Sequence, residues 1–386
     1  MEIAEDVARA LSSKQQEMER AIATLVEVNS FTDNTDGGRK VGALLREVFA
    51  IEGLRGKIVG SARYADHLVF ESTGKAGRLP IALVGHLDTV FPPGTFEGFV
   101  RDGDLRRGPG VLDMKGGLVV VATALSAIAS TCGLDAVAPV RVVIVADEEV
   151  GSPEGQGVIR DAITSGGGAG ACLVFESGRK ADAIITRRKG TGMVKAIARG
   201  KAAHAGNAHA EGVNAIWAAA RFVDRVQQLT DYAKGVTVNV GKILGGTSKN
   251  TVPEQTEVHI DLRFCNAADA EALVAAVKQA ARDAGLSVQG ASIDVEGGVA
   301  RLPLERTEAS VALMEAYAAC ARAAGLGASE APLVGGGSDA STTSAMGIAS
   351  IDGLGPRGVG FHTKDEQIEV ASLVPKAEAL GRFLVG

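Results

Sequence analysis

The hydrophobic pattern of the first half of the chain alternates between short runs that are apolar on both faces and longer segments with helical spacing. The helical segments include residues 116–130 and 155–164. The runs with no polar face, which we predict to be strands, are residues 67–72, 80–87, 140–147 and 171–177. Strands apolar on both faces that alternate with helices are typical of a mainly parallel sheet buried between helical layers. An α/β fold is therefore expected for this part of the chain.

Two amphipathic segments precede this alternation. Their spacing predicts one helix over residues 7–28 and a second over 41–53, and the Asn, Asp and Gly residues of 30–38 indicate a loop between them. The first twenty residues are acidic and polar, whereas a signal peptide would be basic and then apolar. We therefore expect a cytoplasmic protein, although a trimmed chain would give the same pattern.

The pattern changes after residue 187. Residues 188–298 read as strand, helix, two strands, helix and strand, which is the order of a ferredoxin-like α+β domain. The first pattern resumes afterwards with a helix, a Gly-rich turn, a strand and a closing helix. We predict a discontinuous α/β domain, residues 1–187 and 299–386, with the ferredoxin-like domain inserted into it.

Composition narrows the class of protein further. The chain has 386 residues, of which 46% are hydrophobic, so it is long enough for two packed domains. Its formal net charge of -6 argues against a nucleic-acid partner, and no apolar run is long enough to span a membrane. The four cysteines show no C-x-x-C spacing, which argues against a zinc ribbon or a disulfide framework.

The first candidate site is the stretch "GHLDTVF", residues 85–91, at the end of a predicted strand. Strand side chains alternate, so His86 and Asp88 should point the same way. Asp88 could hold a structural imidazole, or it could orient a histidine that binds a metal ion. The stretch alone leaves both readings open.

Further polar residues stand where strands of the same domain are predicted to end: Asp113, the acid triple 147–149, Glu176 and His362. In an open α/β sheet, ligands bind beyond the carboxyl ends of the strands. Each residue has an ordinary alternative, namely a helix N-cap for Asp113, a solvated strand end for the triple, and a salt bridge for Glu176. Together, two histidines and several carboxylates form a suitable ligand set for zinc.

Six stretches, in this order along the chain, carry a family resemblance: "GHLDTVF", "GPGVLDMKGG", "ADEEVGS", "VFES", "GKAAHAG" and "GFHTKDE". They resemble the M20 family of dinuclear zinc metallopeptidases, in particular its glutamate carboxypeptidases, over nearly the whole chain. The resemblance implies a phosphorylase/hydrolase-like catalytic domain with a ferredoxin-like lid that mediates dimerisation. A dinucleotide-binding site at the Gly-rich residues 164–170 is not expected, because they follow a helix and precede a strand.

The resemblance also implies roles for the residues at the strand ends. It implies two Zn²⁺ ions per chain, for which Co²⁺ or Mn²⁺ can substitute, held by His86, Asp113, Glu149, Glu176 and His362. Asp113 would bridge both ions, and Asp88 would fix the tautomer of the ligand His86. Glu148, next to a ligand but not one itself, would be the general base.

In the inserted domain the resemblance implies that His204 helps to stabilise the oxyanion, often from the partner subunit of a homodimer. Asn250 and Arg263 match positions that hold the substrate carboxylate, and a strand-edge salt bridge is the alternative for Arg263. The Gly-rich stretch 335–341 would lie beside the substrate and supply Gly336, Gly337 and Ser338. The histidines at 67, 209 and 259 are expected at the surface.

The function implied is a metallocarboxypeptidase that releases a C-terminal amino acid, glutamate or aspartate, from a peptide or N-acyl conjugate. An N-acyl amino acid deacylase or a desuccinylase of the same family would share the metals and the base. A third alternative is a silent relative that only binds peptide or metal, but Glu148 would then have no use. No G-x-S-x-G stretch offers a nucleophilic serine.

Overall fold

The computed structural model describes residues 2–386 and divides into two compact units. The first unit contains the chain up to Arg187, Arg306–Leu333 and Ser338–Gly386; the second contains Arg188–Glu305 and Val334–Gly337. The second unit thus extends beyond residue 298, where the sequence pattern placed its end. Its last strand continues to Arg301, and the Lys189 N–H donates to the Val334 carbonyl, which attaches the short segment 334–337.

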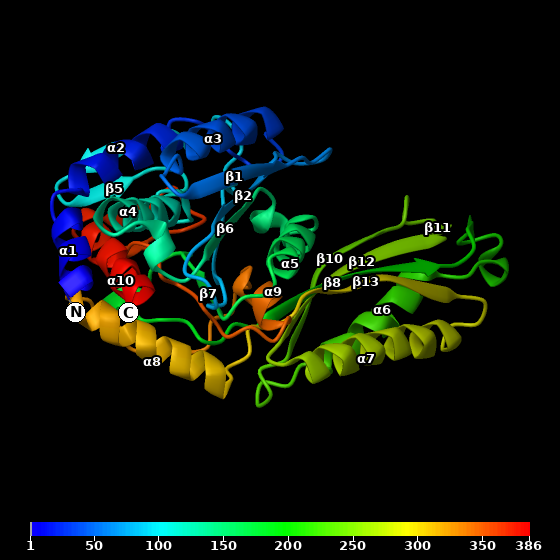
Figure 1. Cartoon of the computed structure of the whole chain (residues 1–386). Coiled ribbons are helices and arrows are strands. Elements are labelled where there is room, and N and C mark those ends of the chain that lie inside the picture. Colours follow the sequence, from blue (N-terminus) through cyan, green and yellow to red (C-terminus); the bar gives the residue numbers. More distant parts are fainter. Residues whose placement is uncertain (1) are drawn as a thin grey trace. The chain divides into compact units, whose positions relative to one another are not determined.

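A six-stranded sheet forms the centre of the first unit (Figure 1). In spatial order its strands are β1 (Leu54–Val59), β2 (His67–Ser72), β6 (Val140–Val145), β3 (Ile81–His86), β7 (Ala171–Val174) and β14 (Ser350–Ile351). Strands β6, β3, β7 and β14 are parallel, whereas β1 and β2 form an antiparallel margin. The mainly parallel sheet predicted from the sequence is confirmed at its centre. Strand β1 was not predicted, because it is largely exposed and lacks an apolar run.

Helices cover both faces of this sheet. Figure 1 shows α1 (Glu2–Leu11), α4 (Lys115–Thr131) and α10 (Leu373–Val385) on one side, and α5 (Gly155–Ser165) and α9 (Ala340–Ser344) on the other. The remaining helices of the unit are α2 (Gln15–Val26), α3 (Thr35–Val48) and α8 (Glu308–Ala323). Helix α4 is buried along most of its length, as its nearly continuous apolar sequence requires. The core of the unit therefore lies between α4 and the sheet.

The two N-terminal helices differ from the prediction. Residues 7–28 do not form one helix, because the chain turns after Leu11, where the Lys14 N–H donates to the Leu11 carbonyl. Helix α3 begins at Thr35, inside the predicted loop. Asn34 explains this start, since its side chain accepts a hydrogen bond from the Gly37 N–H and so caps the helix.

The second unit has the ferredoxin-like order that the sequence predicts. Its main elements are β8 (Gly190–Arg199), α6 (Ala215–Gln227), β10 (Thr237–Gly245), β12 (Gln255–Phe264), α7 (Ala267–Leu286) and β13 (Ser292–Arg301). The sheet order is β10-β12-β8-β13, with every neighbouring pair antiparallel. Helices α6 and α7 cover one face (Figure 1). Alternate residues of β12 are buried against them, so His259, Asp261 and Arg263 lie on the opposite face.

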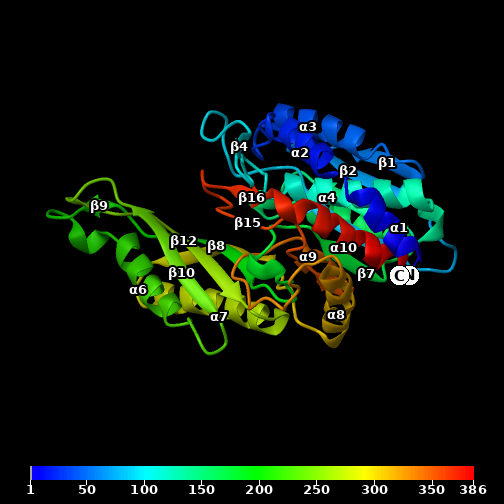
Figure 2. The same ribbon diagram turned by 90° about the vertical axis from the view of Figure 1, so that its left-hand side faces the viewer.

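Two smaller sheets carry loops with predicted site residues. In the first unit, β15 (Gly358–Val359), β16 (Gln367–Glu369), β5 (Leu105–Arg107) and β4 (Val100–Asp102) pair in that order. Figure 2 labels β15, β16 and β4 of this sheet. In the second unit, β9 (Ala203–His204) pairs with β11 (Thr251–Val252). Among residues 2–386, no helix has the length and apolar character needed to cross a membrane. The four cysteines are free thiols.

Candidate metal centre

Three neighbouring parallel strands bring the predicted ligands to one edge of the sheet. His86 is the last residue of β3, Glu149 follows the end of β6, and Glu176 follows the end of β7. Strand β3 pairs in parallel with both β6 and β7, so the carboxyl ends of all three strands meet. This is the edge at which open α/β sheets bind ligands.

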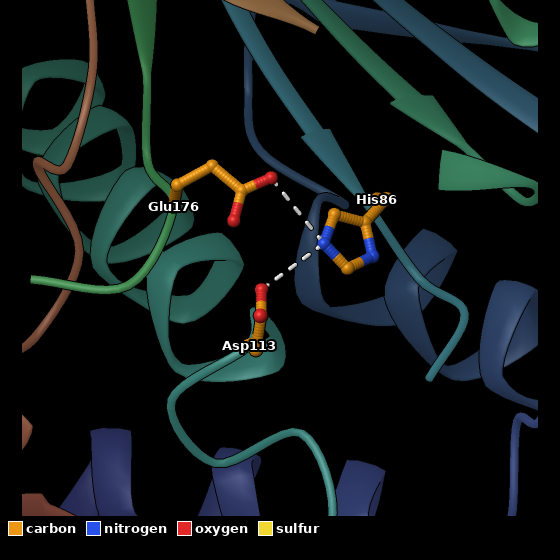
Figure 3. A group of neighbouring side chains, drawn as sticks. All are labelled: His86, Asp113 and Glu176. Atoms are coloured by element: carbon orange, nitrogen blue, oxygen red, sulfur yellow. Dashed lines mark hydrogen bonds and ion pairs between the residues drawn. The ribbon is translucent and has the colours of Figure 1, made fainter. Parts of the chain in front are cut away.

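His86, Asp113 and Glu176 form a first cluster, called here the buried group. The His86 Nε2 atom lies 3.3 Å from Asp113 Oδ1 and 3.4 Å from Glu176 Oε1. Figure 3 shows both carboxylates directed at this one ring nitrogen. All three residues are buried, and their ligand atoms lie within 4.8 Å of one another. At this spacing one metal ion could contact all three ligand atoms.

Asp113, Glu149 and His362 form a second cluster, called here the half-exposed group. The His362 Nε2 atom lies 3.4 Å from Asp113 Oδ2 and 3.0 Å from Glu149 Oε2. His362 comes from the loop between β15 and β16, has a φ of 62°, and keeps 49% of its side chain exposed. Each oxygen of Asp113 therefore faces a different histidine, which is the arrangement a bridging carboxylate needs.

Burial and hydrogen bonds shift the pKa values of the side chains in both groups. Burial raises the pKa of Glu149 to about 8, and the charge of Asp113 adds to this effect. Burial likewise raises the pKa of Glu176 well above its usual range. Hydrogen bonds to Asp113 and Glu149 raise the pKa of His362 to about 10. Without a cation, these carboxylates hold protons that a metal ion would replace.

The donor set fits a divalent metal at each group. Each contains one imidazole and two carboxylates, with Asp113 counted in both, and such mixed nitrogen and oxygen ligands suit zinc and its neighbours. Asp113 is not the helix N-cap considered as its alternative. Met114 occupies that position, and its side chain makes no capping hydrogen bond.

Asp88 holds the backbone between the two groups. Its carboxylate accepts hydrogen bonds from the Glu148 N–H at 3.1 Å, the Glu149 N–H at 3.2 Å and the Thr32 hydroxyl at 2.7 Å. The His86 Nδ1 atom lies 3.0 Å from the Asp88 carbonyl oxygen and 3.4 Å from its carboxylate. The nearer acceptor for His86 is thus the carbonyl. The carboxylate acts chiefly on the segment that carries Glu148 and Glu149.

The three consecutive acids after β6 have different surroundings. Asp147 is fully buried and accepts the N–H groups of Glu154 and Gly155 at the start of α5. Glu149 belongs to the half-exposed group, whereas Glu148 belongs to neither group. Besides burial, the charge of Glu148 contributes to the raised pKa of both Glu149 and Glu176. Glu148 therefore lies close to both groups without being one of their ligands.

In the second unit, His204 and Asn250 are neighbours on the β9–β11 ribbon. The His204 Nδ1 atom accepts the N–H groups of Gly206 and Asn207 at 3.1 and 3.0 Å, so a neutral ring carries its proton on Nε2. The Asn250 Oδ1 atom accepts the Ser248 hydroxyl at 2.6 Å. Both exposed side chains thus keep their N–H donors for other partners.

Arg263 has a partner within its own strand. Its Nε and Nη2 atoms each donate to Asp261 at 2.8 Å, which makes a two-pronged ion pair on the exposed face of β12. This is the strand salt bridge that the sequence left open as the alternative for Arg263. A guanidinium has five N–H donors, so three remain.

The Gly-rich stretch divides between the units: Gly336 and Gly337 belong to the second and Ser338 to the first. In the second unit, Arg188 donates to the Gly336 carbonyl at 3.2 Å, and a Cβ atom on Gly337 would lie 2.9 Å from Arg301 Cδ. The Ser338 hydroxyl donates to Asp352 at 2.6 Å. Backbone approach at the two glycines thus stays a prediction, while the serine has a structural hydrogen bond.

The expected surface position of His67 is wrong. It is 1% exposed at the start of β2, and its Nδ1 accepts the Ala146 N–H at 3.2 Å. Sequence reasoning also missed Thr32 and Glu366, which act on Asp88 and on the Asp113 loop. Neither residue has a local signal, because a hydroxyl in a polar loop and an acid in "HTKDE" look solvated.

Known proteins resemble this chain in sequence and in fold. Residues 186–288 match the peptidase dimerisation domain of M20 peptidases. Carboxypeptidase G2 from Pseudomonas sp. (strain RS-16) is 26% identical over 98% of this chain and 91% of its own length. Acetylornithine deacetylase from Myxococcus xanthus is 33% identical over 46% of this chain and 48% of its own length.

A solved structure extends the likeness to the whole fold. Aminopeptidase PepT from Bacillus cereus ATCC 10987 is 25% identical, with a TM-score of 0.79 over 96% of this chain and 98% of its own. The dimerisation domain, the full-length relative and this structural neighbour point to one family. These comparisons support the M20 family of metallopeptidases, with carboxypeptidase G2 among the similar proteins, and the chain is a hydrolase.

Proposed function

We propose that the chain is a zinc-dependent carboxypeptidase that hydrolyses the amide bond to a C-terminal glutamate or aspartate in peptides or N-acyl conjugates. The observation that carries the proposal is the shared position of Asp113, whose two oxygens face His86 and His362 separately. A carboxylate shared in this way would hold two ions beside the same substrate bond. When bound, the ions would activate the attacking water and polarise the amide carbonyl.

The chain's own residues would handle the protons. Glu148 lies beside both groups and would take a proton from water and pass it to the leaving amine. Asp88 would keep Glu148 in place through the backbone N–H that it accepts. His204, with its proton on Nε2, would donate a hydrogen bond to the developing oxyanion.

Arg263 and Asn250 would select the substrate by its free carboxylate. Asp261 fixes two of the Arg263 N–H groups and so sets the direction of the remaining three. Asn250 would add a neutral donor. A planar guanidinium can hold a carboxylate through two parallel hydrogen bonds, which fixes orientation as well as charge.

We also propose a homodimer formed through residues 186–288, which match a dimerisation domain. Either the same chain or its partner could then supply His204. Helix α6 offers apolar surface for such an interface, because Ile216 and Trp217 are 40% and 51% exposed.

A second candidate is an N-acyl amino acid deacylase or desuccinylase with the same metals and base. The ion pair between Arg263 and Asp261 favours it, since an arginine held by an internal carboxylate need not read a substrate carboxylate. The likeness to acetylornithine deacetylase agrees with this alternative.

The discriminating experiment is a hydrolysis panel with the zinc-loaded enzyme, in which the C-terminal residue and the acyl group vary independently. The carboxypeptidase proposal predicts that rates depend mainly on the C-terminal residue and fall when its carboxylate is amidated. Rates that follow the acyl group and tolerate amidation would support the deacylase instead.

A further inference from the structure

Glu366 is an unusual buried acid because its carboxylate contacts main-chain groups of a distant loop. Its side chain is fully buried. Oε1 accepts the N–H groups of Leu112 and Asp113, each at 2.9 Å, and Oε2 accepts the Gly110 N–H at 3.1 Å. Three donors from one short turn thus converge on a single carboxylate, as in the anion-binding nests that successive backbone N–H groups form.

The backbone of Glu366 adds two further contacts. Its carbonyl accepts the Gly108 N–H at 3.2 Å, and its own N–H donates to the Thr363 carbonyl at 3.2 Å. Thr363 directly follows the ligand His362. Glu366 therefore connects the loop that carries His362 to the loop that carries Asp113.

The position of this connection matters because the two loops would supply ligands to the same ion. The His362 Nε2 and Asp113 Oδ2 atoms are 3.4 Å apart, and Asp113 also serves the buried group. Both loops leave the small sheet, where Gln367 of β16 pairs with Arg107 of β5. That pairing fixes the strands, but the turn at 110–113 lies beyond it. The Glu366 carboxylate reaches this turn and accepts the backbone N–H of Asp113 itself.

We infer that Glu366 is a positioning residue for the metal centre, which sets the bridging carboxylate of Asp113 through the backbone of the 108–113 loop. The inference rests on the proposal that the two groups hold metal ions. It does not depend on which amide bond the enzyme cuts. Because Asp113 belongs to both groups, a shift of its loop would weaken the binding of both ions together.

Glu366→Gln tests the inference with little change in shape. The amide has one acceptor oxygen, so its NH₂ group must face either the Gly110 N–H or the pair at Leu112 and Asp113, and at least one buried donor loses its partner. Removing contacts that orient ligands typically costs about 10-fold to 100-fold in metal affinity. We expect a loss of that size for both ions.

Asp182→Asn is the matched control. Asp182 is also buried, accepts a backbone N–H from Gly327 at 3.3 Å and pairs with Lys376 at 3.4 Å, but it belongs to neither metal group. It should lower the unfolding midpoint of the metal-free protein while leaving metal affinity within about twofold of the wild type.

The measurement is competition between each metal-free full-length protein and a chelator of known Zn²⁺ affinity, with the unfolding midpoint recorded in parallel. If Glu366→Gln does not fold, Glu366→Asp, one methylene shorter with the same charge, carries the same expectation. Wild-type affinity in a folded Glu366 variant, or an equal loss in Asp182→Asn, would overturn the inference. A wild-type chain that does not bind two ions would overturn the proposed function as well.

Discussion

Loading the metal-free protein with zinc should release protons from both groups, and the number from the half-exposed group can be worked out. The pKa of His362 is raised to about 10 by its hydrogen bonds to Asp113 and Glu149, and burial raises the pKa of Glu149 to about 8. Metal ligands must be deprotonated, so both protons leave when the ion binds. The hydrogen bonds from His362 and His86 outweigh burial and keep the pKa of Asp113 well below its usual range, so Asp113 contributes no proton.

The expected count follows from these pKa values. At pH 7 the group with a pKa of about 8 is roughly 90% protonated and the other fully so, which gives about two protons for this ion. At pH 9 the carboxyl has lost its proton and the count falls to about one. The apparent affinity for this ion should therefore rise about a hundredfold per pH unit near neutrality and about tenfold near pH 9.

Isothermal titration of the metal-free protein with Zn²⁺, in buffers of different ionisation enthalpy at each pH, measures the protons released. Glu148→Gln is the control, because it removes an acid beside the groups but none of their ligands, and it should release a number close to that of the wild type. The buried group adds its own protons, since the pKa values of His86 and Glu176 are both raised. A total release below about one proton at pH 7, or no fall between pH 7 and 9, would refute the reasoning.

Further predictions concern stability, the oxyanion, the substrate carboxylate and packing. The raised folded-state pKa values of Glu149 and His362 mean that the metal-free protein should lose stability as pH rises from about 5 to 10, and urea unfolding at pH 6 and 9 tests the sign. His204→Ala should lower turnover roughly 10²-fold to 10³-fold. Confirmed heterodimers of a His204→Ala chain and a Glu148→Ala chain show where the residue acts. Restored activity would place His204 in the partner's site, and no restoration would place it in the site of its own chain. Arg263→Ala should depress kcat/KM severely, and Arg263→Lys should recover it only partly. Amidation of the substrate carboxylate should add little further loss to Arg263→Ala. Equal cleavage of free and amidated substrates by the wild type would contradict this prediction. In Gly117→Ala the new Cβ would lie 2.0 Å from the Phe175 carbonyl oxygen, next to Glu176, so the free energy of unfolding should fall by about 1–3 kcal/mol. Gly157→Ala, with open space around the new Cβ, should be neutral or stabilising.

Three residues of the two metal-capable groups could be predicted from the sequence because they follow strands. His86, Glu149 and Glu176 each come after an apolar run, and the parallel order of those runs brings their ends together. The resemblance to a family then gave the expected roles. The structure brings the same residues into two groups, although the ions themselves stay a proposal.

The supporting contacts could not be predicted in the same way. Glu366 reaches a turn 253 residues away in the chain, and its partners are backbone N–H groups, which carry no side-chain signature. His67 shows the same limit, because the hydrogen-bond partner of its buried ring is the Ala146 N–H at the end of a neighbouring strand. The Asp261 partner of Arg263 follows from strand alternation, because residues two apart share a face. The sequence "HIDLRF" thus allowed a strand salt bridge at Arg263 to be expected, although its partner Asp261 was not named.

The most direct test of the central claim is Glu148→Gln, with metal content and turnover measured on the same preparation. Glu148 lies beside two metal-capable groups and belongs to neither. The account predicts two divalent ions per chain in both proteins and a loss of turnover of about 10²-fold to 10⁴-fold in the variant. Near-normal turnover with both ions bound, or full activity of the wild type in a rigorously metal-free preparation, would contradict it.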